Sequence, residues 1–242
     1  MKIISYKKTK SNLYEITLDN KDKIKLYDEI ILKYNLLLIK DIDLSLLNKM
    51  INENKYYELY NKVLKYLSTK MRSEKEIYNK YKEYDSKDIA KVITKLKEQG
   101  YLNDSEYIKA YINDSINLKM VGYLKIKNDL LKLGFKEEEI VSYLNQIDQD
   151  IWNNKIAKLV DNMIKHNHKY SLNLLKQKIL TNLISKGFFK EDILEYLDSL
   201  EISIDEGIYN KEYNKLKNKL SSKYSDEQLE YEIKKRLKAK GF

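Results

Sequence analysis

The chain has 242 residues and a formal net charge of +9, a length sufficient for one large or two modest domains with their own cores. It contains no cysteine and no apolar run of about 18 residues, which excludes disulfides, cysteine-ligated metals and a membrane span and leads us to expect a cytoplasmic protein. Lysine is overused together with asparagine, isoleucine and tyrosine, as an AT-rich genome would impose. The positive charge therefore makes an anionic partner plausible without establishing one.

The first 27 residues have the alternating pattern of a β-sheet. Hydrophobic and polar residues alternate in three short runs, and Asp19 to Asp22 separate the second run from the third, as a hairpin turn requires. We predict a small three-stranded antiparallel sheet. Short helices are predicted over 27–35 and 43–51, the second with Leu44, Leu47 and Met50 directed inward, and residues 36–42 are ambiguous. These elements form a predicted N-terminal domain, 1–52.

Residues 67–104 contain start and stop signals for two short helices. Ser73 followed by Glu76 is a capping box, in which each side chain satisfies a free amide of the other residue's turn. A second helix is expected after Asp85, because the apolar residues that follow have the three-and-four spacing of an amphipathic helix. Gly100 stands where a left-handed helix end is expected. The stretch is therefore predicted to be a helix–turn–helix unit.

The helical pattern repeats along the rest of the chain. Lys186-Gly187-Phe188 recurs as Lys240-Gly241-Phe242 at an offset of 54 (241 minus 187), and the apolar residues before each glycine recur with it. Each unit has three predicted helices and about 50 residues, and buries its apolar stripe partly against its neighbours. The predicted repeats are 53–104, 105–148, 149–204 and 205–242. The fourth repeat is truncated after its second helix.

This pattern predicts a mainly α-helical fold of tandem three-helix repeats in an elongated curved array, with the small β-containing domain at the N-terminus. Such arrays bind extended partners. Ser225 and Gln228 are expected to form a second capping box at the last helix. The residues predicted to be buried between the helices of their repeats are Ile179, Leu183, Ile233 and Leu237.

No catalytic or metal-binding constellation is visible, and we expect a protein without enzymatic activity or cofactor. His166 and His168 are the two histidines, but residues two apart on a helix point away from each other. The three glutamates at 137–139 are interpreted as a helix start, where negative charge is favourable. Trp152 is predicted to be a core residue rather than a platform for base stacking.

Basic residues are the stronger binding candidates. Arg72 is one of two arginines in a lysine-rich chain, which suggests a need for the planar guanidinium, although a structural pair with a nearby carboxylate would explain it equally. The remaining candidates crowd the second and fourth repeats. They are Lys119, Lys125, Lys127, Lys132, Lys234, Lys235, Arg236 and Lys238.

The chain resembles a known family in three ordered motifs. These are Arg72-Ser73-Glu74, the helix from Ile89 to Leu96, and Gly100-Tyr101-Leu102-Asn103-Asp104. Together they resemble the RecX family, regulators of the RecA recombinase, and the resemblance extends from about residue 60 to the end. The sheet is similar to the N-terminal extension of longer members. The chain departs from the family at residues 113–115, where many members carry a basic residue.

The resemblance implies a non-enzymatic modulator of DNA repair, recombination and the SOS response. Family members lodge in the groove of the RecA–DNA filament and restrain its ATPase and strand exchange, or promote its disassembly. A monomer that binds the RecA filament and also contacts DNA is expected. Two alternatives stay open: a nucleic-acid-binding regulator that acts without RecA, and a helical-repeat scaffold that binds an extended peptide.

Overall fold

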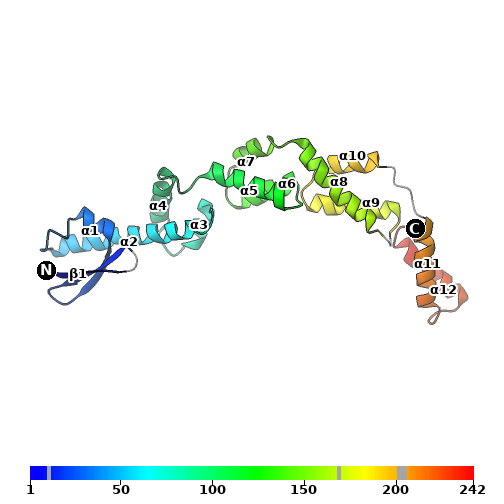
Figure 1. Cartoon of the computed structure of the whole chain (residues 1–242). Coiled ribbons are helices and arrows are strands. Elements are labelled where there is room, and N and C mark those ends of the chain that lie inside the picture. Colours follow the sequence, from blue (N-terminus) through cyan, green and yellow to red (C-terminus); the bar gives the residue numbers. More distant parts are fainter. Residues whose placement is uncertain (10–11, 168–169, 201–205) are drawn as a thin grey trace. The chain divides into compact units, whose positions relative to one another are not determined.

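The structure is a computed structural model that describes residues 1–9, 12–167, 170–200 and 206–242. The chain divides into two compact units, Met1–Tyr107 and Ile108–Phe242, which we take one at a time. The described residues form three strands and twelve helices, which can be followed along the chain in Figure 1. The predicted fold class, mainly helical with a small N-terminal sheet, is confirmed. The elongation of the array and the five-domain division stay predictions.

The N-terminal sheet is antiparallel, with strand order β1-β2-β3. Strands β1 (Ile3–Lys8), β2 (Leu13–Leu18) and β3 (Lys23–Tyr27) are the three that the alternation predicted. Helix α1, Asp28–Lys33, confirms the short helix predicted over 27–35. One face of the sheet packs on α1 and on the start of the next helix. The fully or nearly fully buried side chains of this core include Ile16, Leu18, Leu26, Ile30, Ile31 and Met50.

Helix α2, Leu44–Leu67, corrects one prediction. The helix expected over 43–51 and the first helix of the predicted repeat 53–104 are one continuous helix of 24 residues, so the predicted domain boundary falls inside it. Its start is as predicted, because the Asp43 carboxylate accepts a hydrogen bond from the Leu46 amide at 2.6 Å. No glycine or proline interrupts the chain between the two predicted helices. Apolar residues on successive turns of α2 can therefore pack into two separate cores while the helix stays continuous.

The direction of the Leu44 side chain also differs from the prediction. It was predicted to point inward, but it is 64% exposed. Leu44 is the first residue of α2, and the helix buries Leu47 and Met50 instead. Those two residues were predicted correctly, since they lie three apart on one helix face.

The first helix pair of the repeats has the predicted capping box. Helix α3 covers Glu74–Lys80. The Glu76 amide donates to Ser73 Oγ at 3.2 Å, and the Ser73 amide donates to the Glu76 carboxylate at 2.9 Å. Helix α4, Ser86–Glu98, begins at Asp85, whose carboxylate accepts from the Lys87 amide at 2.7 Å. Both predicted helix starts are confirmed.

Helix α4 ends at a left-handed glycine, as predicted. Gly100 has φ of +78°, and the Tyr101 amide donates to the Leu96 carbonyl at 2.9 Å. This hydrogen-bond pattern closes the helix with a Schellman motif. The apolar residues of α2, α3 and α4 form one core, which contains Leu59, Val63, Ile77, Ile89, Val92, Ile93 and Leu96.

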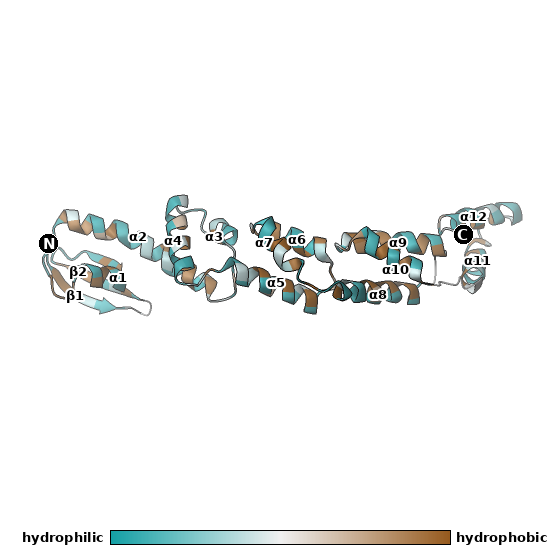
Figure 2. Ribbon diagram, turned by 90° about the horizontal axis from the view of Figure 1, so that it is seen from above, coloured by the Kyte–Doolittle hydropathy of each residue, from teal (hydrophilic) through white to brown (hydrophobic). Residues whose placement is uncertain are grey.

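The second unit continues the three-helix order. Its helices, including the one that begins just before the unit, are α5 (Asp104–Leu118), α6 (Tyr123–Lys132), α7 (Glu137–Leu144), α8 (Gln149–Lys165), α9 (Leu172–Ser185), α10 (Lys190–Ser199), α11 (Glu206–Leu220) and α12 (Asp226–Lys238). Helix α10 packs on both α8 and α9, α6 packs on α7, and α11 packs on α12. Figure 2 shows the alternation of hydrophobic and hydrophilic residues along these helices that amphipathic packing requires.

The start of α12 corrects another prediction. Ser225 occupies the N-cap position with extended backbone, but its side chain makes no capping hydrogen bond. The second capping box is therefore absent. The first turn contains Asp226 and Glu227 instead, whose negative charge favours the same helix end.

The predicted core of the repeats is confirmed. Trp152 is 5% exposed, so it is a core residue as expected. The residues predicted to be buried in the last two repeats are exposed by 3% or less, namely Ile179, Leu183, Ile233 and Leu237.

Replacing Leu183 by alanine is expected to destabilise the protein by about 2–5 kcal/mol, because it leaves a cavity in the core between α8, α9 and α10. Unfolding in urea, followed by circular dichroism, measures this loss. Leu194→Ala on α10 is the matched control, since Leu194 is already 37% exposed and should lose much less. Equal losses for the two variants would contradict the burial of Leu183.

Candidate binding surfaces

Arg72 lies in the connection between α2 and α3, where its guanidinium is engaged by its own unit. The guanidinium carbon lies 3.9 Å from the centre of the Tyr66 ring, and Nη1 lies 3.2 Å from a carboxylate oxygen of Glu76. Nη2 is 3.5 Å from the Thr69 hydroxyl, and 16% of the side chain is exposed. The structural pair with a carboxylate, which the sequence left open, is present. A role for Arg72 in partner binding stays a prediction.

Two of the lysines in the second repeat form ion pairs. Lys125 Nζ lies 3.1 Å from the Asp129 carboxylate, one turn further along α6. Lys127 Nζ lies 2.5 Å from the Glu137 carboxylate at the start of α7. The hydrogen bond that Lys127 donates to the Glu137 carboxylate raises the pKa of Lys127. Each of these charges is therefore partly neutralised by its neighbour.

The other two lysines of that repeat are more available. Lys132 is exposed and forms no ion pair with the described part of the chain. Lys119 is exposed, and its ammonium lies 4.7 Å from the centre of the Tyr111 ring. Lys125 and Lys132 are seven residues apart on α6 and so share a face, whereas Lys127 lies on the opposite side. The structure thus brings together only part of the predicted set.

The C-terminal basic group, which we define as Lys234, Lys235, Arg236 and Lys238, lies on α12. Glu232 pairs with two of its members, at 3.7 Å from Lys235 and 3.6 Å from Arg236. Lys234 and Lys238 are one turn apart on an exposed stripe, and neither forms an ion pair within the described ranges. These two cations are therefore the most available of the group.

Sequence reasoning missed Lys155, the one buried lysine among the described residues. Its ammonium donates to the carbonyl oxygens of Ser115 at 3.2 Å and Lys119 at 2.7 Å, at the C-terminus of α5. Burial lowers the pKa of Lys155. The signal was its position three residues after Trp152 and one before Ile156, within the buried stripe of α8.

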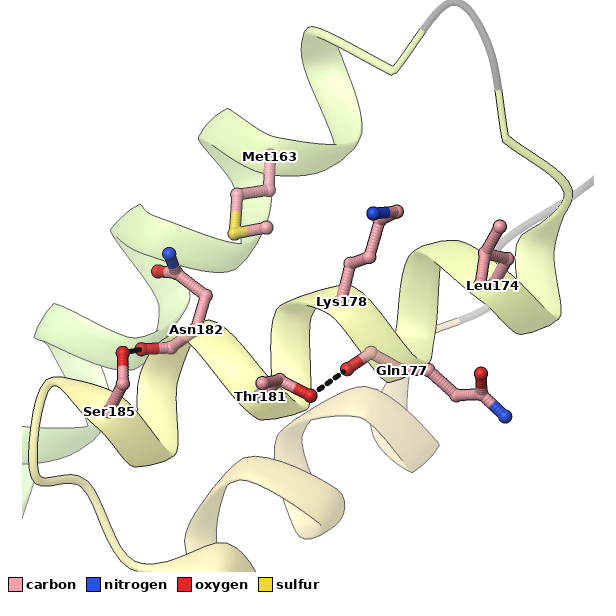
Figure 3. A pocket seen from close by; sticks show the side chains of 7 residues that line it. All are labelled: Met163, Leu174, Gln177, Lys178, Thr181, Asn182 and Ser185. Atoms are coloured by element: carbon pink, nitrogen blue, oxygen red, sulfur yellow. Dashed lines mark hydrogen bonds between the residues drawn. The ribbon is translucent and has the colours of Figure 1, made fainter. Parts of the chain in front are cut away.

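A hollow lies between α8 and α9, with a volume of about 600 Å³. Its lining residues, shown in Figure 3, are Met163, Leu174, Gln177, Lys178, Thr181, Asn182 and Ser185. The Thr181 and Ser185 hydroxyls donate to backbone carbonyls of their own helix, at 2.9 Å and 2.7 Å. Both hydroxyls are thus engaged by α9 itself, and the lining contains no histidine and no carboxylate.

The described residues contain no group of three histidine, cysteine, aspartate or glutamate side chains that could hold a metal ion. His166 Nδ1 lies 2.8 Å from the Asn162 carbonyl oxygen, and His168 lies outside the described residues. The helices of the described ranges are also all too short or too polar to cross a membrane.

Comparisons with known proteins give consistent matches. Residues 60–96 match the family model of the first three-helix domain of RecX. The chain is 32% identical to "Regulatory protein RecX" of Streptococcus agalactiae serotype V, over 98% of this chain and 92% of the relative. It is 26% identical to the Listeria innocua protein of the same name, over 86% of this chain and 80% of the relative.

Solved structures are similar as well. A crystal structure of regulatory protein RecX superposes with a TM-score of 0.70, covering 82% of this chain and 100% of that chain at 23% identity. The crystal structure of RecX from Lactobacillus salivarius gives a TM-score of 0.55, covering 60% of this chain and 97% of its own at 25% identity. Similarity in sequence and in fold therefore extends over most of the chain.

Proposed function

We propose that this chain, which belongs to the RecX family of regulatory proteins, binds the filament of the RecA recombinase on DNA and inhibits its ATPase and recombinase activities. The observation that carries the proposal is the 32% identity to a regulatory protein RecX over 98% of this chain. The protein would act in the cytoplasm as a monomer, in DNA repair, recombination and the SOS response. It would act by binding alone, without a cofactor.

The electrostatics of the described surface support such binding. The exposed lysines without an ion-pair partner among the described residues, which include Lys119, Lys132, Lys234 and Lys238, are free to meet anionic groups. Phosphates of filament DNA and carboxylates of RecA are both suitable partners. Such contacts are screened by salt, so the affinity should fall as the ionic strength rises.

Co-sedimentation with cognate RecA tests the proposal against its two alternatives. We expect the protein to pellet with RecA filaments on single-stranded DNA more completely than with the same DNA alone, and less completely at high salt. Binding to bare DNA that is as complete as binding to RecA filaments, and that weakens at high salt, would favour a nucleic-acid-binding regulator that acts without RecA. Absence of binding to both would leave the scaffold for an extended peptide.

A further inference from the structure

The connection between α5 and α6 is exposed, yet its backbone is fixed. We call residues 118–125 the α5–α6 segment. Leu118 is 78% exposed and Met120 is 40% exposed, so two large apolar side chains face solvent. Lys119 and Lys125, two of the lysines predicted to bind a partner, belong to the same segment. An exposed connection of this kind is ordinarily mobile, because few contacts restrain it.

Lys155 of the third repeat restrains the beginning of the segment. Its ammonium bonds the carbonyl oxygens of Ser115 and Lys119 at 3.2 Å and 2.7 Å, and its side chain is buried. A cation is favourable at a helix C-terminus, where the last carbonyls lack partners. Burying a charge is nevertheless costly, and an apolar residue would often stabilise such a site more. The two hydrogen bonds tie the C-terminus of α5 to α8 and so fix the backbone where the segment begins.

The turn after α9 restrains the end of the segment. The Gly122 amide donates to the Lys186 carbonyl at 2.9 Å, and the Leu124 amide donates to the Gly187 carbonyl at 2.9 Å. Gly187 has φ of +85°, and a β-carbon there would lie 2.2 Å from the Lys125 amide nitrogen. No side chain fits at Gly187, so the two backbones meet directly. The third repeat thus holds both halves of the segment.

We propose that Lys155 and the Lys186–Gly187 turn are positioning residues, which hold the α5–α6 segment as a preformed contact for a protein partner. A preformed segment loses little conformational entropy on binding, so its apolar contacts translate more fully into affinity. The proposal rests on the proposed function, since the partner would be the protein surface of the RecA filament.

The segment's chemistry fits a protein surface rather than nucleic-acid bases. Leu118 and Met120 are aliphatic and suit an apolar pocket, while Lys119 suits a carboxylate at its rim. The aromatic ring of the segment, Tyr123, is turned toward the third repeat. Its centre lies 5.3 Å from that of Phe189 and 6.4 Å from that of Trp152. It is therefore not presented for stacking on a base.

Lys155→Met tests the positioning role, because it removes the ammonium and keeps an apolar stem. Lys158→Met, the same change at an exposed position of α8, is the matched control. We expect Lys155→Met to increase hydrogen exchange at the Gly122 and Leu124 amides by about tenfold and to weaken co-sedimentation with RecA filaments by about tenfold. The control should change neither value.

A second variant separates contact from positioning. Leu118→Ser with Met120→Ser should weaken filament binding by about tenfold and leave exchange at Gly122 and Leu124 unchanged, since both side chains face solvent. Unchanged exchange in Lys155→Met would overturn the positioning role, and unchanged binding in the double variant would overturn the contact. Failure of the wild-type protein to bind filaments would contradict both the proposed function and this partner. Hydrogen exchange in Lys155→Met would still decide whether Lys155 holds the segment.

Discussion

Gly122→Val is expected to destabilise the unit Ile108–Phe242 by about 2–6 kcal/mol. A β-carbon at Gly122 would lie 2.5 Å from the Gly187 carbonyl oxygen and 2.6 Å from the Phe188 amide nitrogen, both backbone atoms that cannot turn aside. Overpacking of this kind costs about 1–3 kcal/mol, and each of the two backbone hydrogen bonds that the clash breaks contributes about 0.5–1.5 kcal/mol. Unfolding in urea, monitored by hydrogen exchange and by circular dichroism, measures the loss in the free energy of unfolding.

Conformational strain does not contribute at Gly122, because its φ of −97° is open to any residue. Gly100→Ala provides the opposite control. Gly100 has φ of +78° and nothing within 4 Å of its β-carbon position, so it isolates the backbone strain, which is about 1–2 kcal/mol. A loss at Gly122 no larger than that at Gly100 would show that the second and third repeats do not meet through these backbones.

Reversing the charge of Lys234 and Lys238 is expected to raise the concentration needed for half-maximal inhibition of RecA by about tenfold or more, which is about 1.4 kcal/mol or more of binding free energy. These lysines are chosen because the other two basic residues of the group already share Glu232. Stability should change little, since exposed charges contribute little to folding. The measurement is the RecA ATPase rate on single-stranded DNA as a function of the concentration of Lys234→Glu/Lys238→Glu.

The matched control reverses two lysines with the same spacing elsewhere. Lys87 and Lys91 are exposed and one turn apart on α4, outside both predicted basic groups. Lys87→Glu/Lys91→Glu makes the same change in net charge and should inhibit nearly as the wild type does. If both double variants inhibit like the wild type while remaining folded, the lysines of α12 serve as a solvated surface only.

Features set by neighbouring residues could be predicted from the sequence. The capping box of Ser73 and Glu76, the left-handed Gly100 and the alternation of the three strands each depend on residues close in the chain, so their patterns are local. The sequence showed the glycine after α9 only as part of the repeated Lys186-Gly187-Phe188 motif. Its second role, meeting Gly122 of the preceding repeat, depends on packing between repeats and could not be read from spacing.

Other features were predicted wrongly or missed, because residue type and spacing alone do not decide how side chains pack. Two apolar stripes with polar residues between them resemble two helices, yet α2 is continuous because nothing in the intervening turn stops a helix. Ser225 has the right residue type for a cap, but the side-chain rotamer decides whether the bond forms. Lys155 reads as a surface lysine, and only its carbonyl partners on α5 reveal why it is buried.

We propose that this chain inhibits RecA by binding the filament. The most direct measurement is the ATPase rate of cognate RecA on single-stranded DNA as the wild-type protein is titrated in, with binding of the protein to the same DNA measured in parallel without RecA. Inhibition at concentrations well below those that coat bare DNA is the predicted result. An ATPase rate that stays constant up to the concentration at which the DNA is coated would contradict the claim.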